Sequence, residues 1–165
     1  MKGLLVSQLI RQYSFADIES FRADHPHDWL VWEPGSWRPP SEDQATIYLP
    51  LPLGAFGKGR SEPLAYELVP PAEGPLTLGR GAQCDISIND GTLSQQHLVL
   101  ARLEGGHWSV RDAGSRNGTL LNRLRLPPGQ EAELLPGAQL EAAGVNLAYY
   151  SPEGMLYRIK RGPPR

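Results

Sequence analysis

The segment HLVLARLEGGHWSVRD, residues 97–112, decides the fold class of this chain. Apolar residues recur at a period of two in both of its halves, which predicts strands over 97–103 and 108–112. Gly105 and Gly106 lie between them, and glycine readily adopts the backbone angles of a tight turn. The segment therefore predicts a β-hairpin.

The same period continues on both sides of this hairpin. It predicts further short strands at 65–69, 76–79, 86–88, 120–121, 123–126, 132–135, 139–142 and 145–150. The chain of 165 residues contains 18 Gly and 16 Pro, which favours a loop-rich β protein, and 40% hydrophobic residues, which is enough for a packed core. Many closely spaced short strands indicate a mainly β protein with a β-sandwich.

The first 33 residues are expected to form an appendage with one helix and one strand. Phe15, Ile18 and Phe21 fall at helical spacing and predict a helix over 15–23, which Ser14 would start together with Asp17. A strand follows at Trp29-Leu30-Val31-Trp32, which is apolar on both faces and so is expected to be covered on both sides. With Trp37, this cluster of tryptophans is either core or a surface that binds a partner.

Residues 34–63 are rich in Pro and Gly and are expected to be a connector with one short strand at 46–49. Thr46 follows two acidic residues and is a candidate for phosphorylation, although an ordinary connector threonine is the simpler interpretation. The main domain is expected at 64–150. Residues 151–165 are expected to form a short helix, begun by Ser151 and Pro152, and a basic tail.

Composition also narrows the classes of function. The net charge of −2 argues against a protein that binds nucleic acid through a basic face. The apolar run near the first residue is too short for a signal peptide or a membrane span, so we expect a cytoplasmic protein without a membrane partner. Cys84 is the single cysteine and excludes an internal disulfide framework. No metal or cofactor motif is present in the sequence.

Polar residues in the second half stand between the strand-like runs. They are Arg80 after one run, Ser94 and His97 before another, and Asn117 in the segment Gly114-Ser115-Arg116-Asn117-Gly118-Thr119. Because a sheet can hold several loops together at one end, we expect these side chains to share a surface. A guanidinium, a hydroxyl and an amide are donors that suit a phosphate and the peptide that carries it.

These segments, in this order and spacing, resemble forkhead-associated (FHA) domains over roughly residues 64–150. The resemblance rests on Leu78-Gly79-Arg80, Asp85-Ile86-Ser87-Ile88, Leu93-Ser94-Gln95-Gln96-His97, Asp112 to Thr119, and Asn122. It does not cover residues 1–63. It implies a sandwich of two twisted antiparallel sheets whose loops at one end bind a phosphothreonine peptide.

The resemblance also implies a role for each matched residue. Arg80, Ser94 and Arg116 would contact the phosphate, and Asn117 would hydrogen-bond the peptide backbone. Gly79, His97 and Gly118 would support the site. The physical chemistry agrees, because a phosphate carries about −1.5 to −2 charges and three acceptor oxygens, and arginine presents a charged fork of donors.

Two positions depart from the commonest pattern of the family. Gln95 stands where many members have a basic residue, and Thr92 stands where some members read a ligand side chain. We expect Thr92, Gln95 and Asn122 to contact the peptide. Arg123 and Arg125 are candidates to supply the missing positive field.

The expected function is a non-enzymatic module that binds phosphothreonine in a partner protein downstream of a Ser/Thr kinase, without a cofactor. An alternative keeps the fold as a phosphate-independent scaffold and places the partner on the tryptophan-rich N-terminal region. An enzyme is the third possibility, but the sequence shows no paired carboxylates in a plausible cleft, no nucleophile elbow and no metal cluster.

Overall fold

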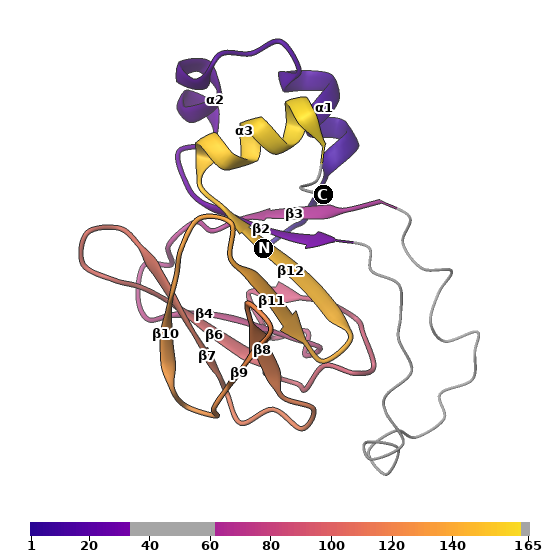
Figure 1. Ribbon diagram of the computed structural model, residues 1–165, viewed down its shortest axis with the longest axis vertical. Helices are drawn as coiled ribbons and strands as arrows, with labels where there is room; N and C mark the ends of the chain where they lie inside the picture. Colours follow the sequence, from indigo (N-terminus) through magenta and orange to yellow (C-terminus); the bar gives the residue numbers. More distant parts are fainter. Residues whose placement is uncertain (34–61, 163–165) are drawn as a thin grey trace.

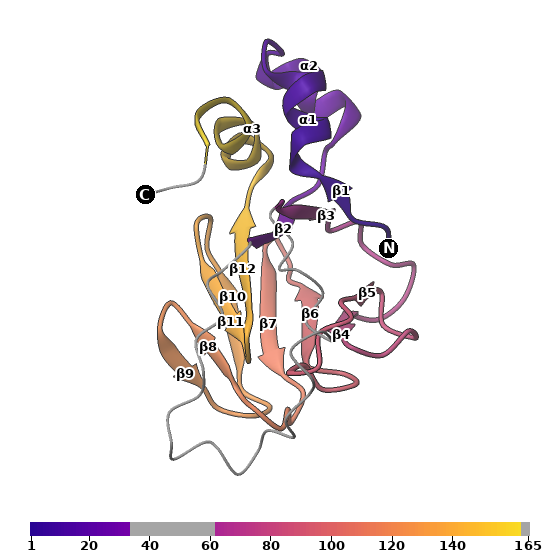
Figure 2. The same cartoon turned by 90° about the vertical axis from the view of Figure 1, so that its right-hand side faces the viewer.

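The described residues fold into two β-sheets packed face to face, with three helices at one end (Figure 1 and Figure 2). This arrangement comes from a computed structural model that describes residues 1–33 and 62–162. The β-sandwich predicted from the sequence is confirmed. The expected strand at 46–49, Thr46 and Trp37 lie outside the described residues.

The larger sheet has seven strands, and all of its neighbouring pairs are antiparallel. In spatial order they are β1 (Leu4–Leu5), β3 (Leu64–Glu67), β2 (Trp29–Glu33), β12 (Val145–Tyr150), β11 (Gln139–Ala142), β8 (Thr119–Leu121) and β9 (Leu124–Leu126). The strand β2, which the sequence assigns to an N-terminal appendage, lies between β3 and β12. It is therefore an interior strand of the sandwich.

The smaller sheet has five strands. In spatial order they are β10 (Glu131–Leu134), β7 (Trp108–Asp112), β6 (Leu98–Arg102), β4 (Leu76–Gly79) and β5 (Ile86–Ser87). The pair β4–β5 is parallel, and the other pairs are antiparallel. The hairpin between β6 and β7 turns at Gly105 and Gly106, whose φ angles are 91° and 89°, as the sequence predicts.

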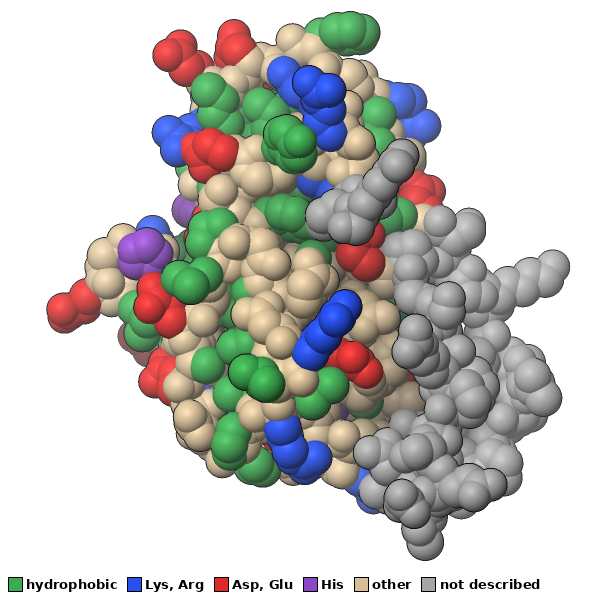
Figure 3. All heavy atoms as spheres, in the orientation of Figure 1, with side chains coloured by type: hydrophobic (Ala, Val, Ile, Leu, Met, Phe, Trp, Pro, Cys, Tyr) green, Lys and Arg blue, Asp and Glu red, His purple; other side chains and the backbone are tan. Residues whose placement is uncertain are grey.

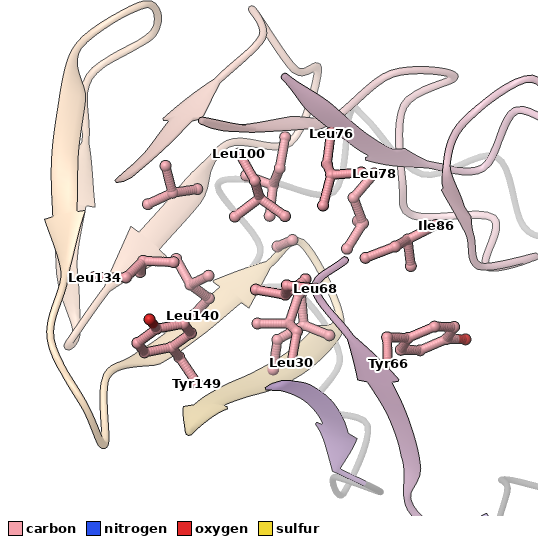
Figure 4. Packing of buried hydrophobic residues seen from close by; sticks show 14 of the residues in the cluster. Leu30, Tyr66, Leu68, Leu76, Leu78, Ile86, Leu100, Leu134, Leu140 and Tyr149 are labelled. Carbon is pink, nitrogen blue, oxygen red and sulfur yellow. The ribbon is translucent and has the colours of Figure 1, made fainter. Parts of the chain in front are cut away.

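The main core fills the space between the two sheets. Leu30 and Leu140 of the larger sheet and Leu78, Leu100 and Leu134 of the smaller one point into this space and are almost completely buried (Figure 4). Because successive side chains of a strand alternate between its faces, each strand presents only half of its residues to this core.

A second core lies on the outer face of the larger sheet, under the three helices. They are α1 (Val6–Tyr13), α2 (Ile18–Asp24) and α3 (Pro152–Arg161). Trp29 and Val31 of β2 belong to this second core, while Leu30 belongs to the main one. The strand is thus covered on both sides, which confirms the expectation drawn from its continuous apolar sequence.

The first helix is absent from the sequence-based expectations. Val6, Leu9 and Tyr13 are buried at a helical spacing of three and four residues, and they attach α1 to the second core. This signal was available in the sequence.

The predicted start of the next helix is wrong. Ser14 ends α1, because its backbone N–H donates to the Ile10 carbonyl. The second helix begins at Ile18, and the Asp17 side chain caps it by accepting from the Ser20 N–H at 2.7 Å. Phe15 precedes this helix and is fully exposed.

The third helix follows the expected pattern. Ser151 accepts from the Gly154 N–H at 3.2 Å, and Pro152 occupies the first turn, where its missing N–H is harmless. Near its end, the buried Arg158 donates to both carboxylate oxygens of Glu33, at 3.1 and 3.0 Å. This pair ties α3 to β2.

The helices and the loops that carry the polar motifs lie at opposite ends of the sandwich (Figure 1). We call the end with α1, α2 and α3 the capped end. The open end is formed by loops 80–85, 88–97 and 113–118. Within the described residues, no helix is long and apolar enough to cross a lipid bilayer.

Candidate functional site

The open end brings Arg80, Ser94, Arg116 and Asn117 together from three separate loops. Direct hydrogen bonds join the loops: the Arg80 N–H donates to the Ser94 carbonyl at 2.9 Å, and the Arg116 N–H donates to the Ser94 hydroxyl at 3.0 Å. Asn117 reaches the same loop through Thr92. Residues separated by up to 37 positions in the sequence therefore share one surface.

Arg80 is held at its base and exposed at its tip. Its Nε donates to the Leu93 carbonyl at 3.2 Å, which leaves the two terminal nitrogens of the guanidinium available. Gly79 allows this approach, because a Cβ at this position would lie 2.3 Å from the Gln95 carbonyl oxygen. A side chain at position 79 would push the loop of Ser94 away from Arg80.

Ser94 is half-buried, and its hydroxyl accepts one hydrogen bond from the protein. Its oxygen accepts the Arg116 N–H, and its own hydrogen has no acceptor within the described part of the chain. A serine hydroxyl can make both bonds at once. The hydroxyl hydrogen is therefore free for a ligand that lies between the side chains of Arg80 and Arg116.

His97 fixes the loops from beneath. It is completely buried, its Nδ1 accepts from the Ser94 N–H at 3.1 Å, and its Nε2 lies 3.1 Å from the Gly118 carbonyl. Since a carbonyl can only accept and an N–H can only donate, these partners require the neutral ring with hydrogen on Nε2. Burial lowers the pKa of His97, and the contacts with Gly118 and Asp112 oppose this shift only in part.

Asp112 organises the loop that carries Arg116 and Asn117. It is buried, and its carboxylate accepts from the backbone of Gly114, the backbone and hydroxyl of Ser115, and the hydroxyl of Thr119. Burial alone would raise the pKa of Asp112, but these hydrogen bonds hold it below its usual value. The carboxylate therefore stays charged and keeps the turn in one conformation.

The Asn117 side chain also uses part of its hydrogen-bonding capacity within the protein. Its Nδ2 donates to the Thr92 carbonyl at 2.8 Å, while its Oδ1 is buried and has no hydrogen-bond partner among the described residues. One N–H of the amide remains available. The side chain can therefore position the loop of Thr92 and contact a ligand at the same time.

Thr92 does not offer its side chain to a ligand. Only 5% of it is exposed, and its hydroxyl donates to Asp90 at 2.5 Å and accepts from the Gly144 N–H at 3.1 Å. The prediction that its side chain contacts the peptide is corrected by this burial. The side chain of Gln95, in contrast, is exposed beside Ser94.

Asn122 lies away from these residues. It stands in the turn between β8 and β9 with φ of 50°, at the opposite end of this hairpin from Thr119. Its Oδ1 accepts from the Gln139 N–H at 2.9 Å, so it connects the turn to β11. The expected peptide contact of Asn122 is therefore replaced by a structural bond.

The two arginines that follow Asn122, Arg123 and Arg125, lie at different distances from the loops of the open end. Arg123 belongs to the same distant turn, with φ of 67°. Arg125 lies on β9, and its guanidinium carbon would be 3.6 Å from a Cβ placed on Gly118. Only Arg125 therefore adds positive charge next to Asn117.

The open end keeps its positive charges exposed. Arg80, Arg116 and Arg125 are exposed, and none of them forms an ion pair with another described residue. Basic side chains are visible over the part of the surface where Figure 1 draws β8, β9 and the loops below them (Figure 3). The arrangement suits an anion held by charge-assisted hydrogen bonds.

Two supports of the site were not identified from the sequence as a network. One is the set of bonds that Asp112 accepts, and the other is the pair of bonds from Thr77 to Asp85, at 2.8 Å for both Thr77 donors. Short Asp and Thr residues beside loops are the available signal, because their side chains bond nearby backbone groups. Cys84 is buried beside this network, and its Sγ lies 3.1 Å from the Gln95 carbonyl.

The tryptophans of the N-terminal region take part in packing. Trp29 is completely buried in the second core, and Trp32 packs against the main core. Among the residues that the structure describes, no group of three His, Cys, Asp or Glu side chains could hold a metal ion.

Comparison with known proteins finds a family match over part of this chain. Residues 76–142 match the family model described as the FHA domain. The glycogen accumulation regulator GarA of Mycolicibacterium smegmatis is 38% identical over 71 residues, which are 43% of this chain and 42% of that protein. A transcription factor 19-like protein of Mus musculus is 34% identical over 108 residues, which are 60% of this chain and 38% of that protein.

The chain thus spans less than half the length of these two relatives. Among solved structures, it is similar to the N-terminal FHA domain of Rad53p from S. cerevisiae in complex with a phosphothreonine peptide. The sequence identity is 22%, the match covers 56% of this chain and 88% of the other, and the TM-score is 0.48.

Proposed function

We propose that this chain, whose residues 76–142 are an FHA domain, binds phosphothreonine in a partner protein through the open end. Modules of this type read phosphorylated motifs with arginine. The observation that carries the proposal is the convergence of Arg80, Ser94 and Arg116, which leaves two exposed guanidinium groups and one free hydroxyl hydrogen around one position.

The chemistry of each group fits a phosphate. A phosphate has three acceptor oxygens and a charge of about −1.5 to −2. Arg80 and Arg116 supply charge-assisted donors, and Ser94 supplies a neutral one. The remaining N–H of Asn117 lies beside them for a backbone carbonyl of the peptide. Four loop residues thus cover both the modification and the chain that carries it.

The proposal also includes the origin of the phosphate and the place where the chain acts. The partner would be phosphorylated by a Ser/Thr kinase, and the chain would act in the cytoplasm as an interaction module without catalysis. The alternative scaffold that binds its partner through tryptophans is not favoured by Trp29, which is completely buried in the second core, and Trp32 is partly buried against the main core.

Binding of a fluorescent phosphothreonine peptide library, measured by anisotropy, tests the proposal. The Arg80→Ala variant should lose at least ten-fold in affinity, because one charge-assisted hydrogen bond contributes about 1.5–3 kcal/mol. Arg102→Ala is the matched control, since Arg102 is also an exposed arginine and stands at the end of β6 that is far from the loops. Equal binding of unphosphorylated peptides would show that the proposal is wrong.

A further inference from the structure

The position of Arg125 suggests a second determinant beside the phosphate site. A Cβ placed on Gly118 would lie 3.5 Å from Arg125 Nη2 and 3.6 Å from both Cζ and Nη1. Three guanidinium atoms at nearly equal distances indicate that the planar group lies flat against Gly118. Its N–H groups, which lie in that plane, then point sideways along the surface.

Gly118 is a rigid support for this group. Its N–H donates to the Ser115 hydroxyl at 2.9 Å, and its carbonyl accepts from His97. Its φ of 80° lies in the region that glycine adopts without strain, and the missing side chain leaves room for the guanidinium. The guanidinium of Arg125 therefore lies beside a residue whose own backbone is fixed.

The charge of Arg125 is not neutralised by a neighbour. It is exposed and forms no ion pair with any residue the structure describes. The nearest acidic position in the same row of the sheet is Glu141, and Leu120 stands between them. The backbones of Arg125 and Glu141 are about 9.5 Å apart across the sheet, and no ion pair forms between them.

The distance to the phosphate site sets what Arg125 could contact. Gly118 follows Arg116 by two residues, which span at most about 7 Å. An extended peptide advances about 3.3 Å per residue. A peptide whose phosphate lies between Arg80 and Arg116 would therefore bring a residue within about three positions of the phosphothreonine to Arg125.

We propose that Arg125 makes this site selective for phosphothreonine peptides that carry an Asp or Glu within about three residues of the modification. The proposal rests on the proposed function and names the class of peptide that the site prefers. A carboxylate matches the fork of a guanidinium and can accept two parallel hydrogen bonds from it. The preference would reside on β9, outside the loops that hold the phosphate.

The test is a double-mutant cycle with defined peptides. A phosphothreonine peptide with alanine at its flanking positions is compared with versions that carry one Glu, or one Gln, at each position from four before to four after the modification. Each peptide is titrated against the parent chain, Arg125→Gln and Arg123→Gln. The second variant is the matched control, because Arg123 has the same charge but lies in the turn at the other end of the hairpin.

We expect one Glu position to increase affinity for the parent chain by about two- to five-fold over Gln, the range of a partly exposed ion pair. Arg125→Gln should abolish this gain, and Arg123→Gln should keep it. The inference is overturned if no position prefers Glu, or if Arg125→Gln weakens the Glu and Gln peptides equally. In both cases phosphate-dependent binding would survive, whereas failure of every phosphopeptide would also remove the proposed function.

Discussion

At the capped end the buried Arg158 is paired through two hydrogen bonds with Glu33, whereas Arg80 and Arg116 at the open end are exposed and have no ion-pair partner among the described residues. A buried cation without its anion would be strongly destabilising, so the capped end satisfies its charge internally. The open end keeps its cations in water. The difference separates the part of the molecule that stabilises the fold from the part that is available for an anion.

The two ends also differ in the chemistry of their buried side chains. The capped end is filled with aromatic and aliphatic side chains, such as Phe21 and Trp29. Beneath the open end lie His97, Asp112 and Thr119, which are buried. Thr119 donates to Asp112, and His97 donates to the Gly118 carbonyl. Polar networks of this kind fix a unique geometry when every member has a partner. The open end thus has a rigid base under exposed donors.

Truncating an aromatic residue in the core of the capped end should lower stability and leave phosphopeptide binding unchanged. Phe21 is fully buried, and its ring lies 5.0 Å from that of Tyr13 and 6.2 Å from that of Trp29, measured between centroids. Phe21→Ala should lower the free energy of unfolding by about 3–5 kcal/mol. Urea denaturation followed by tryptophan fluorescence measures this change, and the affinity of the folded protein for a phosphopeptide should stay the same.

Phe15→Ala is the matched control, because Phe15 is fully exposed and precedes α2. It should leave stability within about 0.5 kcal/mol of the parent chain. A loss of phosphopeptide affinity in folded Phe21→Ala would contradict the separation of the two ends, since it would mean that the helices control the loops.

A side chain at position 79 should break the open end. In Gly79→Ala the new Cβ would lie 2.3 Å from the Gln95 carbonyl oxygen and 2.9 Å from the Gln96 Cα, so the backbone of the Ser94 loop must move. Overpacking of this kind costs about 1–3 kcal/mol. Because Ser94 moves with this loop, phosphopeptide affinity should fall at least ten-fold, as measured by isothermal titration calorimetry.

Gly154→Ala makes the same substitution at the capped end. There the nearest atoms to a new Cβ are at 3.5 Å, an ordinary contact, and alanine favours the helix α3 by up to about 1 kcal/mol. The control should therefore gain stability and keep its affinity. Parent-like affinity in Gly79→Ala would show that the approach of Gln95 to Gly79 is not needed for the site.

The sequence predicted the architecture of the sandwich because its signals are local. The alternation of apolar residues located β4, β7, β11 and β12 at their observed bounds. It also predicted that β2 is covered on both sides. It did not predict that β2 enters the larger sheet, because pairing with β3 and β12 depends on contacts between residues that are far apart in the chain.

The sequence predicted which residues form the site better than it predicted where their side chains point. Arg80, Ser94, Arg116 and Asn117 were expected on one surface and are joined there by hydrogen bonds. Thr92 and Asn122 were expected to face the peptide and instead bond within the protein. Side-chain direction depends on how loops pack, and sequence spacing does not determine it. The same reason explains why Arg125 approaches Gly118 and Arg123 does not.

The smallest expected effect is a change of stability with pH. It would sharpen the contrast between the buried polar groups beneath the open end and the apolar core of the capped end. Burial lowers the pKa of His97 in the folded protein, so the unfolded chain binds a proton first as the pH falls below about 6.5. The stability that neutral His97 contributes is complete above that pH and decreases toward the folded-state pKa, by at most about 1.4 kcal/mol per pH unit. The lowered pKa of Asp112 adds a separate loss at more acidic pH.

Urea denaturation between pH 7.5 and 5.5 measures this decrease, and His97→Gln should make it smaller. If that variant does not fold, nitrogen NMR of the parent chain decides the point: the His97 ring should remain neutral, with hydrogen on Nε2, at pH values where an ordinary histidine is charged. A ring that protonates near pH 6.5 without loss of stability would mean that the bonds to Ser94 and Gly118 do not depend on the neutral form. The rigid base under the exposed donors would then need another explanation.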